Sequence, residues 1–259
     1  MNFLFPYGQR RIKTLLLFLI GMVLVGNIYA TTDTSEYEKK RNLIVSQQLL
    51  EQHAQWNKLI EKLEKKSSAN PEYFLDFLFY KTHNTLLKNY GKHSDFGKML
   101  ETGDYDCVSG SLAYSLILTY FNIDHSIIET DYHVFIVARI DGKDFILEST
   151  DPLNGFIKDE NAVIQYIAKF KPDPLTKVIQ NTIEIGAESY LTTETNTIFK
   201  KINIKQLSGL QYYNHGIYAI KEQNYPLAKA KISQALALYP SERIYSVYEL
   251  ISSLENADQ

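Results

Sequence analysis

Cysteine is the scarcest chemically reactive residue in this chain of 259 residues. Cys107 is the single cysteine, so the chain cannot form an internal disulfide. One thiol is also too few for a zinc site built from cysteines, and the six histidines form no His-Glu-x-x-His pair. The sequence has no phosphate-cradling glycine-rich loop and no serine in a nucleophile-elbow setting. It therefore implies no metal and no organic cofactor.

An excess of charge of one sign is also lacking. Lys and Arg together number 27 against 30 Asp and Glu, a formal net charge of −3. A mildly acidic chain is a poor match for a phosphate backbone, so nucleic acid is not an expected partner. The hydrophobic share of 45% is enough for one large core or two small ones, which excludes a disordered chain and a small disulfide scaffold.

The first thirty residues contain the longest apolar run. Three basic residues between positions 10 and 13 precede eleven apolar residues at 15–25, and Ala30 offers a small residue for a signal peptidase. This pattern predicts a signal peptide over residues 1–30, and hence an exported protein, periplasmic or secreted. The run is shorter than the roughly 20 residues of a membrane-spanning helix. Counting residues 28–29 lengthens it, so an uncleaved anchor and membrane attachment form the alternative.

The first half of the mature chain is predicted to be helical. Apolar residues recur at helical spacing over 36–66, and a polar stretch with Pro71 then breaks the pattern. A second helix is predicted over 72–90. After a turn at 102–106, a third and buried helix is predicted to begin at or next to Cys107 and to extend to Tyr120.

The pattern then changes to strands and returns to helices. Residues 125–130, 134–140 and 145–149 are rich in Ile, Val and Phe and are predicted strands. Asp141-Gly142 is a two-residue hairpin signal. The chain becomes helical again from Gln206 onward. This order of helices, a small antiparallel sheet and more helices predicts the α+β class.

The hairpin loop determines the expected register of its two strands. A two-residue loop at Asp141-Gly142 pairs Ile140 with Lys143 and places Arg139 opposite Asp144. Arg139 and Asp144 carry opposite charges, which favours this register.

The same register brings two chemically useful residues together. His133 and Glu148 then share one face of the sheet with Phe135, and Glu148 lies diagonal to His133, at a distance that two polar side chains can bridge. Asp151 falls on the opposite face unless the strand is bulged. The sequence therefore predicts Glu148 as the carboxylate partner of His133.

Cys107, His133 and Glu148 together suggest nucleophilic catalysis. A helix start favours a thiolate, an imidazole accepts and returns the proton, and a carboxylate orients the imidazole. Asp104 and Asp106 oppose the thiolate electrostatically. Each member of the trio also has an ordinary structural role, as a packed thiol, a surface histidine and a solvated carboxylate. Their order and shared face favour a catalytic site.

The residues around this trio resemble a known family. Residues 103–114, Gly-Asp-Tyr-Asp-Cys-Val-Ser-Gly-Ser-Leu-Ala-Tyr, resemble the nucleophile motif of the transglutaminase-like superfamily. Residues 133–137 and 147–150 resemble its histidine and acid strands. The resemblance covers roughly 70–160 and implies a papain-like fold, with a nucleophile helix packed on a small antiparallel sheet. It implies a catalytic triad of Cys107, His133 and Glu148.

The match departs from the family pattern in two places. The acid is usually Asp, whereas this chain has Glu148, and Asp144-Phe145 stands where Trp is common. The backbone amide of Cys107 is the one candidate for the oxyanion hole. The resemblance implies a cysteine hydrolase, a protease or amidase, that cleaves an amide bond of a peptide or protein substrate through an acyl-enzyme on Cys107. One alternative is a catalytically silent scaffold or binding module of the cell envelope. Another is acyl transfer to an amine.

The C-terminal segment resembles a second family. Residues 209–242 match one tetratricopeptide unit at Tyr212, Gly216, Tyr225, Ala228, Ala235 and Pro240. Such repeats normally need about three units to be stable, so this one is expected to lean on the catalytic domain, either as a packing element or as a site for a protein partner. The expected organisation is a signal peptide or anchor at 1–30, a transglutaminase-like domain with a helical extension at 36–205 and a helical segment at 206–259.

Overall fold

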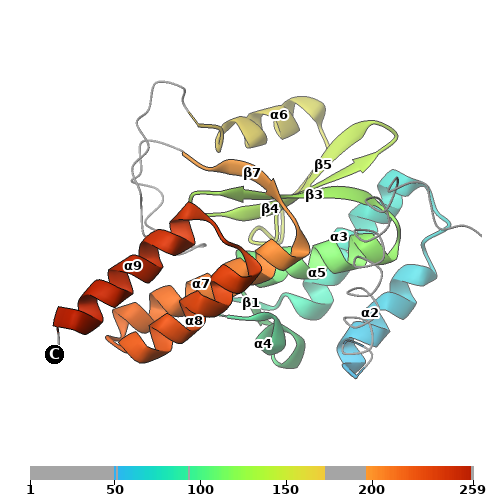
Figure 1. Ribbon diagram of the computed structural model, residues 1–259. Coiled ribbons are helices and arrows are strands. Elements are labelled where there is room, and N and C mark those ends of the chain that lie inside the picture. The colour runs from blue at the N-terminus through green and yellow to red at the C-terminus, as the bar shows by residue number, and fades with distance from the viewer. Residues whose placement is uncertain (1–49, 51, 93, 173–196, 258–259) are drawn as a thin grey trace, which may run out of the picture. The chain divides into compact units, whose positions relative to one another are not determined.

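A five-stranded antiparallel sheet lies at the centre of the structure, a computed structural model that describes residues 50, 52–92, 94–172 and 197–257 (Figure 1). The strand order is β6-β5-β4-β3-β7, and every neighbouring pair is antiparallel. The strands are β3 (Asp124–Thr130), β4 (Val134–Ile140), β5 (Lys143–Leu147), β6 (Phe156–Ile157) and β7 (Phe199–Ile202). With helices on both of its faces, this sheet confirms the α+β class. The predicted signal peptide lies outside the described residues.

The hairpin between β4 and β5 has the predicted register. Ile140 pairs with Lys143, and Arg139 pairs with Asp144. The Arg139 guanidinium donates two hydrogen bonds to the Asp144 carboxylate, at 2.7 and 3.1 Å. Asp141 and Gly142 have φ angles of +51° and +80°, as a tight hairpin turn that follows the twist of its strands requires.

Helix α5 (Cys107–Tyr120) begins at the predicted residue. Asp106 caps it, because its carboxylate accepts hydrogen bonds from the backbone N–H and hydroxyl of Ser109, and Ser109 accepts one from the Asp106 N–H in return. Nearly every side chain of the helix is buried. A Cβ placed on Gly110 would lie 2.7 Å from the Cβ of Ser149, so only glycine allows α5 to approach the chain beyond β5 so closely.

Successive residues of β4 face two different layers. Val134 and Ile136 belong to the main core together with α5, whereas Phe135 belongs to a second apolar cluster together with Val163 of α6 (Glu160–Ala168). The sheet therefore lies between α5 and α6, as Figure 1 shows. Sequence patterns did not predict α6.

The helices before α5 differ from prediction at their ends. The chain forms α2 (Ala54–Glu64), α3 (Pro71–Leu86) and α4 (Phe96–Glu101). The helix predicted over 36–66 is interrupted, because His53 has an extended backbone immediately before α2; residues 36–49 lie outside the described part. Helix α3 ends four residues early, because the strand β1 (Asn89–Tyr90) pairs in parallel with β2 (Asp104–Tyr105). No pattern predicted α4.

The C-terminal segment forms α7 (Ile204–Lys221), α8 (Tyr225–Leu238) and α9 (Glu242–Ala257). Helices α7 and α8 approach closely at Gly216, where an added Cβ would lie 2.5 Å from Cδ1 of Ile232. Leu207 and Tyr213 of α7 are fully buried in the same core as α5. Residues of both expected domains thus contribute to one apolar core. No helix within the described ranges is long and apolar enough to span a membrane.

Candidate active site

Helix α5 places Cys107 beside the beginning of β4. The side chain of Cys107 has no exposed surface. Its thiol receives a hydrogen bond from the backbone of Val134, the residue that follows His133. The bond from the Ser111 hydroxyl to the Val134 carbonyl, at 3.2 Å, joins α5 to this strand, and the close packing at Gly110 places the helix against Ser149, which follows β5.

His133 and Glu148 are in direct contact, as the register predicts. Nε2 of His133 lies 2.6 Å from Oε2 of Glu148, and the two side chains are 11% and 6% exposed. Glu148 follows β5 rather than ending the strand, because its N–H bonds the carbonyl of Gly155 and the chain turns there. The Asp151 carboxylate accepts the backbone N–H groups of residues 153 and 154, so it stabilises its own turn.

Glu148 has hydrogen-bond donors on both carboxylate oxygens. Oε1 accepts the backbone N–H of Thr150 at 2.8 Å and its hydroxyl at 2.6 Å, and Oε2 accepts the hydroxyl of Tyr166 together with His133. Burial opposes ionisation, yet His133 and these donors outweigh it and lower the pKa of Glu148 to about 2. Glu148 is therefore a carboxylate at neutral pH.

This carboxylate determines the tautomer of His133. An ionised Glu148 can only accept, so Nε2 of His133 donates to it, and in the neutral form of the imidazole Nδ1 is the nitrogen that holds the lone pair. Nδ1 makes no hydrogen bond among the described residues. The pair thus presents a histidine with one nitrogen fixed and the other available as a base.

Aromatic side chains enclose the imidazole. Its ring stacks on Phe135 at 6.3 Å and on Phe170 at 5.9 Å, each with an interplanar angle of 26°. Tyr166, which bonds Glu148, contacts both phenylalanines edge-on or tilted. Sequence reasoning missed Tyr166 and Phe170. The apolar spacing of Val163, Tyr166 and Ile167 was the available signal, since it marks one face of a helix.

The resting thiol is neutral, contrary to what a helix start alone would favour. Burial raises the pKa of Cys107 well above its ordinary value, and the charges of Asp106 and Glu148 raise it further. The sequence predicted that the negative charge of Asp106 would disfavour the Cys107 thiolate, and this is confirmed. Asp104 does not contribute in this way; its carboxylate bonds Asn89 and Thr102 instead. Cys107 and His133 share no hydrogen bond in the described structure.

Two further features bear on the chemistry of the site, a backbone amide and, within the part of the chain that the structure describes, the lack of a metal-binding group. The backbone amide of Cys107 lies in the first turn of α5, where helical N–H groups lack partners within the helix, as the predicted oxyanion donor requires. Among the described residues, no group of three or more His, Cys, Asp or Glu side chains is placed to hold a metal ion.

The chain matches no protein-family model, no curated protein and no solved structure. The strongest geometric feature of the site is the contact between His133 and Glu148, two residues that are 15 positions apart in the sequence.

Proposed function

We propose that this protein is a transglutaminase-like cysteine hydrolase that cleaves an amide bond in a peptide or protein. The observation that carries the proposal is the 2.6 Å contact through Nε2 of His133, which leaves Nδ1 free as a base, next to a strand residue that bonds the Cys107 thiol. The predicted signal peptide would deliver this activity outside the cytoplasm or, if it is uncleaved, at the membrane surface.

The neutral resting thiol favours general-base attack rather than a preformed ion pair. As Sγ of Cys107 adds to the substrate carbonyl, Nδ1 of His133 takes the thiol proton, and Glu148 stabilises the resulting imidazolium. The Cys107 amide donates to the carbonyl oxygen as it becomes negative. The imidazolium then protonates the leaving amine, and a thioester remains. Water, deprotonated by His133, releases the acid and restores the thiol.

Access to the sulfur is a requirement of this mechanism. Because Cys107 has no exposed surface, a substrate carbonyl can reach Sγ only after the side chains that cover it move. Opening would also admit water and lower the cost of charge at the site.

The burial of Cys107 favours a second candidate, a catalytically silent binding module. In that case the pair of His133 and Glu148 would serve only to fix α6 and the strand end. A cavity of about 340 Å³ that no member of the trio lines, with residues of α4, α5, α7 and α8 such as Phe96 and Tyr212 around it, would be a more natural site for a partner of the helical segment.

Acylation by an activated ester separates these two candidates. Because Cys107 is the single cysteine, the part of the mass increase after exposure to p-nitrophenyl acetate that neutral hydroxylamine removes reports a thioester on one thiol, whereas acylated lysines keep their added mass. We expect native protein to be acylated at neutral pH, His133→Gln to react on the order of 10²-fold more slowly, and Cys107→Ser not to react. His215→Gln, which changes a histidine outside the site, should match the unmodified protein.

Three results would decide between the alternatives. Acylation that depends on His133 supports the enzyme. A thiol that stays inert in the native protein at every pH, yet reacts once urea is added, would establish the silent module instead. If a primary amine such as butylamine captures the acyl group faster than water does, the reaction is acyl transfer and hydrolysis is overturned.

A further inference from the structure

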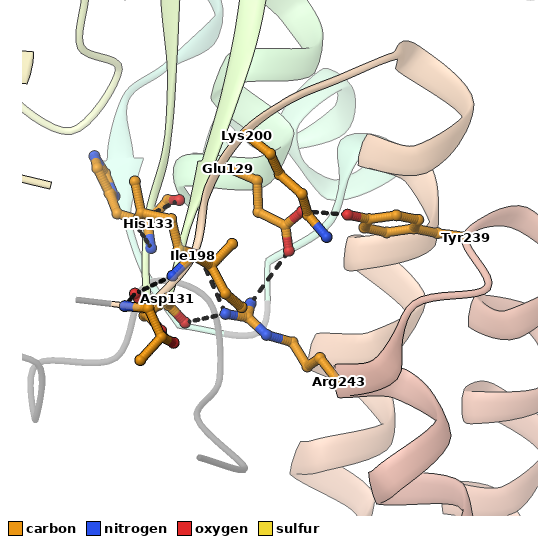
Figure 2. Close-up of polar contacts among 9 residues, drawn as sticks. Glu129, Asp131, His133, Ile198, Lys200, Tyr239 and Arg243 are labelled. Atoms are coloured by element: carbon orange, nitrogen blue, oxygen red, sulfur yellow. Dashed lines mark hydrogen bonds and ion pairs between the residues drawn. The ribbon is translucent and has the colours of Figure 1, made fainter. Parts of the chain in front are cut away.

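A buried ionic cluster adjoins the site and plays no part in the chemistry above. It joins Glu129 of β3, Lys200 of β7, Tyr239 after α8 and Arg243 of α9 (Figure 2). The side chains of Glu129 and Arg243 are 1% and 6% exposed. A buried ion pair is often no more stabilising than apolar residues of similar volume. Stability alone therefore does not explain this cluster, and the contacts that its side chains make indicate what else it does.

The Glu129 carboxylate is contacted by one hydroxyl donor and two positively charged side chains, from three different parts of the fold. Tyr239 donates its hydroxyl to Oε2 of Glu129 at 2.5 Å, and Nζ of Lys200 lies 3.6 Å from the same oxygen. Nη1 of Arg243 lies 3.5 Å from Oε1. Glu129 therefore compensates the charge that α9 brings into the core.

The other terminal nitrogen of Arg243 contacts backbone rather than a carboxylate. Nη2 donates to the carbonyl of Thr130 at 3.2 Å and to that of Asp131 at 2.6 Å. These two residues open the turn between β3 and β4, and the turn closes at His133. Its ends are joined by bonds from the Thr130 N–H and hydroxyl to the His133 carbonyl, at 2.9 and 3.0 Å, and from the His133 N–H back to the hydroxyl, at 3.0 Å.

The same turn is held from a second side. The Asp131 carboxylate accepts the backbone N–H groups of Thr197 and Ile198, at 2.7 and 2.9 Å, and the Thr197 hydroxyl. Figure 2 shows Asp131 with Ile198 and Arg243 beside it. The backbone of this turn, which ends at His133, is thus held by contacts between residues 66 to 113 positions apart in the sequence.

We propose that Arg243 is a positioning residue for His133: through the carbonyls of Thr130 and Asp131, α9 holds the turn from which the imidazole reaches Glu148. This inference rests on the proposed function for its catalytic meaning. It makes the C-terminal helical segment part of the active site. Lysine at position 243 would keep the positive charge but lose the planar guanidinium, whose two terminal nitrogens contact Glu129 and the two backbone carbonyls at the same time.

A pair of variants separates positioning from charge burial. Glu129→Gln keeps the Arg243 side chain and its donors to the turn, whereas Glu129→Gln combined with Arg243→Met removes them and leaves no buried charge unpaired, since Lys200 is 45% exposed. Nitrogen NMR of the His133 ring at neutral pH, assigned with His133→Gln, reports its tautomer. Far-ultraviolet circular dichroism confirms folding, and the rate of Cys107 acylation reports function.

We expect Glu129→Gln to keep the Nε2–H tautomer of His133 and an acylation rate within about twofold of the unmodified protein. The double variant should be folded, show a mixture of tautomers and acylate at least tenfold more slowly, with Arg243→Lys between the two. A folded double variant with an unchanged tautomer would overturn the inference. If its tautomer changes but no protein, unmodified or variant, acylates Cys107, Arg243 does position His133 and the proposed function is wrong.

Discussion

Glu148 concentrates more polar contacts than its neighbours, and its ionisation has a measurable consequence. Its pKa is lowered to about 2 in the folded protein, against an ordinary value of 4.5. A carboxyl whose pKa falls on folding stabilises the protein above its ordinary pKa and loses that contribution as the pH drops towards the folded value. The affected window therefore lies between about pH 4.5 and pH 2.

We expect Glu148→Gln to flatten the acid dependence of stability in that window. The unmodified protein should lose on the order of 3 kcal/mol more free energy of unfolding than the variant between pH 6 and pH 2, measured by urea denaturation. Glu72→Gln is the matched control, because Glu72 forms an exposed pair with Lys143 that contributes little. Parallel curves for the unmodified protein and Glu148→Gln would contradict the assignment.

At the scale of elements, the site depends on how closely α5 approaches the chain after β5. Gly110 allows this approach, since a Cβ would meet both Cβ and Oγ of Ser149, at 2.7 and 2.8 Å. Ser149 directly follows Glu148, so the packing that positions α5 also positions Glu148. A methyl group at this contact must shift one of the two segments.

Gly110→Ala should therefore destabilise the protein by about 1–3 kcal/mol, although alanine is the better helix former. Urea denaturation at pH 7 measures the change. Gly91→Ala is the comparison, because a Cβ there would meet Ser94 at an ordinary 3.6 Å. Equal stabilities of the two variants would mean that α5 is not held where the structure places it.

At the scale of the whole molecule, the helical segment and the sheet share a core. Leu207, Leu210 and Tyr213 of α7 are fully buried in the cluster that also contains residues of α5 and β4. Arg243 adds a polar connection from α9 to the turn after β3. Separating the segment at residue 206 would expose these apolar side chains to water.

We expect α7 and β4 to unfold in one cooperative step. Their slowest backbone amides should exchange hydrogen with the same free energy of opening, within about 1 kcal/mol, in hydrogen exchange followed by mass spectrometry. A chain that ends at residue 203 should not fold. If α7 exchanges several kcal/mol more easily than β4, the segment is an independent domain.

Local patterns in the sequence predicted much of the central architecture. The apolar run after Asp106 predicted α5 and its first residue, and Asp141-Gly142 predicted the register that brings His133 to Glu148. These features depend on periodicity, capping and turn geometry, which act over a few residues. The catalytic role of the trio and the family resemblances stay predictions.

Other features were decided by contacts between distant parts of the chain. The pairing of β1 with β2, the bond from Tyr166 to Glu148 and the contact of Arg243 with the turn at 130–133 all require the folded core before the partners meet. The burial of Cys107 was also decided by contacts between distant parts of the chain. The sequence alone determined that the thiol begins α5 and that the hairpin register brings the imidazole and the carboxylate to one face, although Glu148 lies just after β5 rather than within it. Only the tertiary structure decided that the thiol is covered and neutral, because desolvation depends on every segment that packs around it.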